Sequence, residues 1–140
     1  MAIYNKFDAF TEHVLEKVHD IDLDTLRIYL TDNAPDAALD AVKADLVESV
    51  AGINGYTAGG HDVTAATSRV GGTTAVNGTD IVITAAGGSI GPFRYAVLYN
   101  DTPVAPADPL IGWWDYGGSI IVAAGESFTI DFNPSLFTLT

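Results

Sequence analysis

The sequence predicts a mainly β domain, an antiparallel β-sandwich or barrel-like fold that follows an amphipathic helix at the amino terminus. Short runs rich in Val, Ile, Thr and aromatic residues alternate with glycine-containing turns through most of the chain, as in all-β domains. Fifteen charged residues lie in 1–50 but nine in 51–140, so the later part has a sheet-like composition. Helical spacing of apolar residues is clearest at the start.

The length of 140 residues suits a single domain that spans 1–140. We expect an amino-terminal helix within 1–21 and a mostly antiparallel β region over 25–140, with a possible short helix at 37–45. There are no cysteines, so neither disulfides nor a thiolate metal site can contribute.

The first expected element is a helix from Tyr4 to His19. Apolar side chains recur there at steps of three and four and form one stripe, made of Ile3, Phe7, Phe10, Val14, Val18 and Ile21. We expect this stripe to face the domain's own core in preference to a partner.

The run 25–31 alternates apolar and polar residues and predicts a strand with one buried face. The segment 37–51 is ambiguous. Leu39, Val42 and Leu46 fit a helical stripe that Asp36 could cap, whereas alternation from Leu46 to Val50 fits a strand.

From Gly52 onward, glycines and alternating apolar residues predict short strands joined by turns. Asn77–Gly78 is a strong hairpin signal, because type I′ turns need positive φ at both central positions. Asn100–Asp101 and Gly117–Gly118 are similar signals. The expected strands are 62–70, 79–85, 93–100, 110–116, 119–123, 126–132 and 136–140.

The segment 102–109, TPVAPADP, is predicted to be a stiff loop between two strands. Its three prolines lack the backbone N–H that a central strand needs. We expect the loop, which includes Pro103 and Pro106, to project from the sheet.

A net charge of −12 argues against nucleic acid and anionic membranes as partners, because both attract clustered Lys and Arg. The acidic balance can serve solubility or match a basic partner, and we favour solubility. We find neither a secretion signal nor an apolar run long enough to span a membrane.

Searches for catalytic and metal-binding motifs give no positive result, so we expect neither an enzyme nor a cofactor. The acidic run 20–24 resembles the start of a calcium loop, but Thr25 and Thr31 replace the required Gly and Glu. His13 and His19 are six residues apart, which does not suit a zinc pair on one helix face, and we expect exposed histidines. No G-x-S-x-G or P-loop motif occurs.

Two features of the strand region bear on interactions. Trp113 and Trp114 are adjacent, so they must point to opposite faces of a strand. One can fill the core, and the other must be covered by the protein itself or by a partner. Arg94 is expected to pair with Asp115 or another acid across neighbouring strands.

Four motifs and the amino-terminal AIYNKF resemble a family of small structural proteins of tailed bacteriophages. The motifs are GYTAGG (55–60), IGPFRYAVLYND (90–101), LIGWWDYGGSI (110–120) and GESFTIDF (125–132). The resemblance implies a capsid decoration or cement protein made in the host cytoplasm and found in the virion, on the head in preference to the tail. Its implied partners are the major capsid protein, further copies of itself, or both. It transfers no catalytic or ligand-binding residue.

We therefore expect a homo-oligomer whose contacts involve the amino-terminal segment, the proline loop and the tryptophans; the candidate residues are Tyr4, Phe7, Trp113, Trp114, Pro103 and Pro106. Deletion of residues 1–20 should weaken attachment or oligomerisation. Two alternatives remain. One is a ring-forming tail or head–tail connector component. The other is a carbohydrate- or receptor-binding module that uses an exposed tryptophan beside Asp115 and Tyr116.

Overall fold

The computed structural model describes residues 2–140 and confirms the mainly β class, with 44% strand and 7% helix. The strands form antiparallel sheets, and the helical content is one short helix, α1 (Ala9–Leu15), and a 3₁₀ turn, η1 (Lys43–Asp45). Across these residues, no helix has the length and apolar character needed to cross a bilayer.

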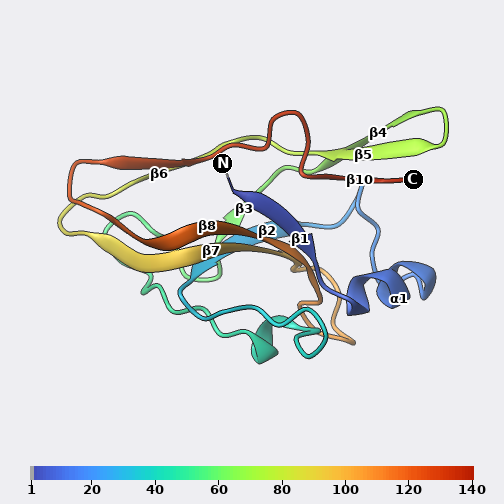
Figure 1. Cartoon of the computed structure of the whole chain (residues 1–140), viewed down its shortest axis with the longest axis horizontal. Coiled ribbons are helices and arrows are strands. Elements are labelled where there is room, and N and C mark those ends of the chain that lie inside the picture. Colours follow the sequence, from blue (N-terminus) through green and yellow to red (C-terminus); the bar gives the residue numbers. More distant parts are fainter. Residues whose placement is uncertain (1) are drawn as a thin grey trace.

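A five-stranded antiparallel sheet forms the centre of the molecule (Figure 1). Its middle is a hairpin of two long strands, which carry apolar residues on both faces. In spatial order the strands are β1 (Ile3–Lys6), β8 (Leu110–Val122), β7 (Ile90–Asn100), β2 (Leu26–Thr31) and β3 (His61–Asp62).

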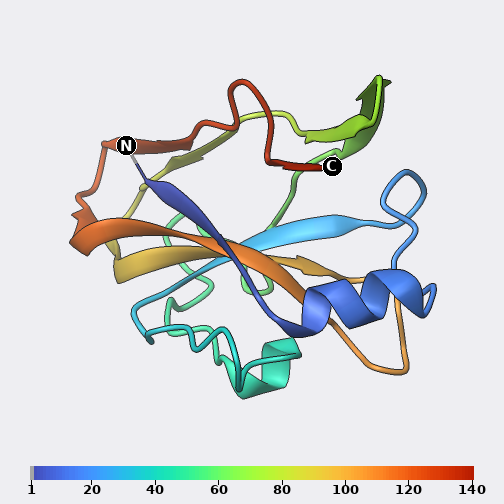
Figure 2. The ribbon, with the colours of Figure 1, turned by 45° about the vertical axis from the view of Figure 1, so that its right-hand side comes forward.

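Two smaller sheets lie over one face of this central sheet, and the long connection 32–60, with η1, lies over the other (Figure 2). The first small sheet has the order β10-β5-β4, and the second pairs β6 with β9. Their strands are β4 (Ala66–Val70), β5 (Thr73–Asn77), β6 (Ile81–Thr84), β9 (Ser127–Ile130) and β10 (Phe137–Leu139).

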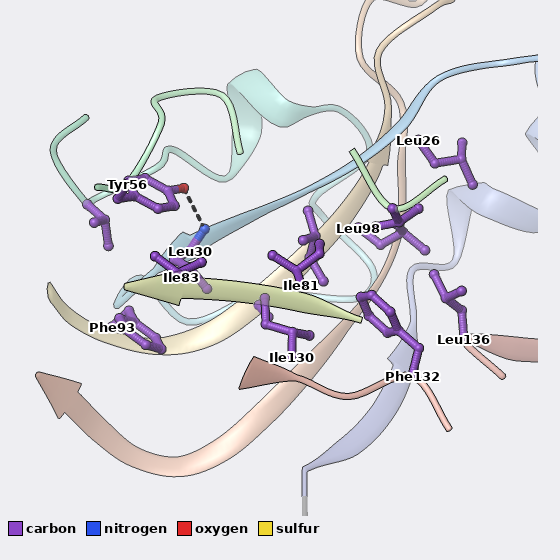
Figure 3. Close-up of a cluster of buried hydrophobic side chains, with 14 of the residues drawn as sticks. Leu26, Leu30, Tyr56, Ile81, Ile83, Phe93, Leu98, Ile130, Phe132 and Leu136 are labelled. Carbon is purple, nitrogen blue, oxygen red and sulfur yellow. Dashed lines mark hydrogen bonds between the residues drawn. The ribbon is translucent and has the colours of Figure 1, made fainter. Parts of the chain in front are cut away.

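The central sheet therefore separates two buried clusters. The larger lies between it and the small sheets, where side chains from β2, β6, β7 and β9 converge (Figure 3). The smaller lies beneath the 32–60 connection and contains Phe7, Tyr29, Leu46, Tyr95, Val97, Tyr99 and Leu110. This second cluster explains why β2 is buried on both faces, whereas its alternation predicted one.

The amino-terminal helix is shorter than predicted. Residues 3–6 form edge strand β1 on β8, with Tyr4 opposite Trp114 and Lys6 opposite Gly112. Gly112 makes this pairing possible, because a Cβ there would collide with the Tyr4 ring. Pairing with β1 gives the backbone groups of β8 hydrogen-bond partners along an edge that would otherwise be open. This stabilisation depends on a distant strand, so the helical periodicity of residues 3–21 does not reveal it.

The predicted helix at 37–45 is wrong beyond the three residues of η1. Asp36 Oδ1 accepts hydrogen bonds from the N–H groups of Ala38 and Leu39, and Asp45 Oδ2 accepts from Ala41 and Val42. Aspartate side chains that bind nearby backbone N–H groups compete with helix formation.

The predicted hairpin at Asn77–Gly78 is also wrong. The hairpin forms instead at Gly71–Gly72, between β4 and β5, and Gly71 has the positive φ (60°) that such a turn requires. At Gly78 the chain crosses between sheets, where a Cβ would lie 2.5 Å from Leu136 Cδ1. Tight packing, in place of a turn, explains that glycine.

Gly117–Gly118 is not a turn between two strands, because β8 runs continuously through it. The pairing jumps from Tyr95–Asp115 to Phe93–Ile120, so β8 has an extended bulge there. The bulge also places Phe93 in the larger cluster with Ala96 and Leu98, whereas strict alternation along the strand would put it with Tyr95 and Val97 in the smaller cluster. The strands predicted at 25–31, 93–100 and 126–132 correspond to β2, β7 and β9, which begin or end within a few residues of the predicted bounds.

Candidate interaction surfaces

The two tryptophans lie on opposite faces of β8, as predicted, and the protein's own side chains cover much of each. Trp113 packs in the smaller cluster, with its ring centroid 4.6 Å from that of Phe7. Trp114 packs against the larger cluster, 5.2 Å from Tyr4 and 5.7 Å from Phe132. Each indole is half-buried, so part of its surface is covered by the protein and part remains exposed.

Phe7 belongs to the core, so it is not available to a surface interface, contrary to the expectation from the sequence. Its side chain is fully buried, and its N–H donates to the carbonyl of Ile111 (3.1 Å). Tyr4 is half-buried and stacks on Phe137 of β10. The first twenty residues therefore contribute to both clusters. Their deletion would remove core packing, so it would not show whether this segment contacts a partner.

The proline loop projects as expected, but its prolines are not its most exposed part. Pro103 and Pro106 are half-buried, whereas Val104 between them is 88% exposed. The loop closes on itself through an antiparallel bridge between Val104 and Ala107. A partner that reached this loop would meet Val104 first.

The predicted pair of Arg94 and Asp115 is confirmed. The guanidinium donates from Nε to Oδ1 (2.8 Å) and from Nη2 to Oδ2 (3.1 Å), a bidentate geometry. Hydrogen bonds from Arg94 and from the N–H of Gly117 hold the pKa of Asp115 below its usual range. Asp115 thus joins β7 to the bulge of β8, which is a structural role.

The β4–β5 hairpin is the most exposed strand pair and is hereafter called the arm (66–77). Every residue of β4 is exposed, and β4 is the edge of its sheet (Figure 1). Within residues 2–140, no strand pairs with its outer side. At the start of the strand, Asp22 Oδ1 accepts hydrogen bonds from the hydroxyl (3.1 Å) and the N–H (3.4 Å) of Thr67. Val70 at the end of β4 is 85% exposed.

The histidines are not simply exposed, contrary to expectation. A reversal after α1, with Lys17 at φ 62°, brings the rings of His13 and His19 within 6.0 Å of each other. His13 Nδ1 and His19 Nε2 are enclosed and have no hydrogen-bond partner among the described residues. His19 Nδ1 lies 3.1 Å from the amide nitrogen of Asn100, which also donates to Asp24 (2.6 Å).

This environment predicts a pH-dependent stability. Burial, aided by His13 and opposed by Asp24, lowers the pKa of His19 to about 4. Between pH 6.5 and 4, His19 binds a proton in the unfolded chain but not in the folded protein. The free energy of unfolding therefore falls as the pH drops through this window. Since the ring is partly exposed, we expect a loss of about 1–2 kcal/mol, measured by urea denaturation at several pH values. The variant His19→Gln should show a shallower loss; parallel curves would contradict the assignment.

No group of three or more His, Asp or Glu side chains within the described chain is placed to hold a metal ion. Comparisons of the sequence and structure with protein families, curated proteins and solved structures find no match. The argument for function therefore depends on the surfaces described above.

The strands expected at 62–70 and 79–85, with a turn at Asn77–Gly78 between them, leave out β5 and therefore the arm. A signal for it exists: Gly71–Gly72 separates two runs rich in Thr and Val, TSRV and TTAV, which is the pattern of a two-residue hairpin.

Proposed function

We propose that this chain is a non-enzymatic structural protein of a tailed-phage virion, a capsid decoration or cement protein that binds and stabilises the head lattice. The arm carries the proposal, because it presents an exposed edge strand whose outer side no other strand of the described chain covers. The sequence resemblance to phage structural proteins supports the same role. The facing layers favour the sandwich-like form of the expected fold over the barrel-like form.

An edge strand as open as β4 is suited to pairing with another chain. Proteins usually protect such edges with prolines, bulges or several charges. The strand β4 has no proline, pairs with β5 in an uninterrupted register, and carries one charged residue, Arg69. Backbone hydrogen bonds to an added strand would supply affinity without a large apolar surface.

Charge also favours the arm as the contact. Residues 63–79 contain one charged side chain, Arg69, in a chain of net charge −12. Arg69 donates to the carbonyl of Gly71 (2.9 Å), which holds the guanidinium near the end of the arm. A locally basic arm can approach an acidic surface, on the capsid lattice or on a second copy of this chain, while the acidic bodies repel.

If the arm is the contact, substitutions in it should weaken the binding of the protein to phage heads. The double variant Arg69→Glu, Val70→Asp should bind heads built from the phage's major capsid protein at least about tenfold more weakly than wild type, as measured by co-sedimentation. The charge reversal removes the attraction, and the acid at Val70 obstructs strand pairing. Folding should be unaffected, because both side chains are exposed.

Val82→Asp is the matched control, since Val82 is 62% exposed on β6, at the opposite end of the molecule (Figure 1). It should bind heads like wild type. Equal binding by the arm variant would contradict the proposed contact. Immunogold label confined to tails would favour the ring-forming connector role, and absence of the chain from purified virions by mass spectrometry would overturn the structural role.

A further inference from the structure

A second surface, separate from the arm, has the features of a small-molecule pocket. It opens between β1 and β8 on one side and the segment 129–136 on the other, with a volume of ≈ 330 Å³. That volume lies at the lower end of the range for ligand sites, about 300–1,000 Å³. The opposite face of the sheet, which carries Trp113, does not line it.

One wall of the pocket is aromatic. Trp114 and Tyr116 lie two residues apart on β8, so they share a face, and Tyr4 lies opposite Trp114 on β1. Trp114 and Tyr116 are both half-buried. Packing against neighbours holds the rings in place: Tyr116 contacts Phe128 edge-on, with 5.2 Å between centroids. Because the rings are already held in place, little side-chain entropy would be lost when a ligand packs against their apolar faces.

The opposite wall is mixed, with polar side chains beside Ile130, Pro134 and Leu136. It includes Asp131, Asn133 and Ser135. Asp131 Oδ1 accepts the N–H of Asn133 (2.9 Å), which fixes the carboxylate, and its second oxygen remains available. Burial raises the pKa of Tyr116 to about 12, so its hydroxyl stays protonated and can both donate and accept at neutral pH. The enclosed hydroxyl of Tyr4 also lacks a hydrogen-bond partner within residues 2–140.

We infer that this pocket binds a neutral pyranose sugar, stacked on Trp114 and Tyr116 and hydrogen-bonded by Asp131 and Asn133. A pyranose ring combines an apolar C–H face with a rim of hydroxyl groups, which matches an aromatic wall that faces a wall with several hydrogen-bonding side chains. The carboxylate of Asp131 and the net charge of −12 disfavour phosphorylated and acidic sugars. This site is independent of the proposed attachment through the arm.

The two tryptophans make a direct test possible, because each single-tryptophan variant reports on one face of β8. The probes are glucose, galactose, mannose and N-acetylglucosamine, followed by saturation-transfer NMR and by tryptophan fluorescence. We expect dissociation constants of about 1–10 mM for the best of them, as is usual for ligands of this size. The fluorescence response should persist in Trp113→Phe and disappear in Trp114→Phe.

The variant Asp131→Asn keeps the shape of the pocket and should weaken binding about fivefold or more. It also keeps the test decisive if Trp114→Phe does not fold. No saturation transfer to any of the four sugars in the wild-type protein would overturn the inference. A response that Trp113→Phe abolishes, or that Asp131→Asn leaves unchanged, would also overturn it.

Discussion

Replacing Phe7 with alanine is expected to lower the free energy of unfolding by about 3–5 kcal/mol. The ring is fully buried and packs on Trp113 in the smaller cluster. Its removal would leave a cavity between β1 and the 32–60 connection, where few atoms can relax into it. Urea denaturation followed by circular dichroism measures the loss directly.

Leu15→Ala is the control from the same amino-terminal segment. Leu15 is 87% exposed, so its truncation should change stability by no more than about 0.5 kcal/mol. If Phe7→Ala melted like wild type and lost only attachment to phage heads, the aromatic ring would be an interface residue and the core assignment would be wrong.

Replacing Gly60 with alanine should be similarly severe, with a loss of about 3 kcal/mol or more. Gly60 has φ 88°, a conformation that residues with a Cβ rarely adopt. A Cβ at this position would also collide with the carbonyl oxygen of Ile28 in β2. The variant must therefore move the chain away from the sheet, and thermal unfolding should show a large drop in Tm.

Gly118→Ala is the matched control, because a Cβ at Gly118 would meet no atom within 4 Å and its φ lies outside the positive region. It should change stability by about 0.5 kcal/mol or less. A Gly60→Ala protein as stable as the control would show that the 52–60 loop is free to shift.

The large loss of stability expected for Gly60→Ala follows from the hydrogen bonds and close backbone contacts of the GYTAGG motif (55–60). The Tyr56 hydroxyl accepts the N–H of Leu30 (2.9 Å) and donates to the carboxylate of Glu48. The Tyr99 hydroxyl donates to the carbonyl of Gly59 (2.5 Å). These buried and partly buried hydrogen bonds attach the long connection to the central sheet, and the glycines allow the backbones to come close. The motif therefore has a structural role, because it fixes the 52–60 loop to the central sheet.

Several features could be predicted because they depend on near neighbours along the chain or across one hairpin. Alternation located β2, β7 and β9, and the opposite faces of Trp113 and Trp114 follow from strand geometry alone. The pairing of Arg94 with Asp115 could be predicted because Arg94 is the one basic residue of its strand and Asp115 is an acid on the next strand.

Other features depend on partners distant in the sequence, and local periodicity could not reveal them. Residues 3–6 fit a helical stripe but form a strand, because the edge of β8 offers backbone partners and Gly112 leaves room for Tyr4. The pocket combines Trp114 with Asp131, and the histidine cluster combines His19 with Asn100. Composition and alternation thus established the β class, the acidic surface and several strands. The layer arrangement, the exposure of the arm and the pocket were decided by burial and long-range pairing, whose energies depend on which distant surfaces meet.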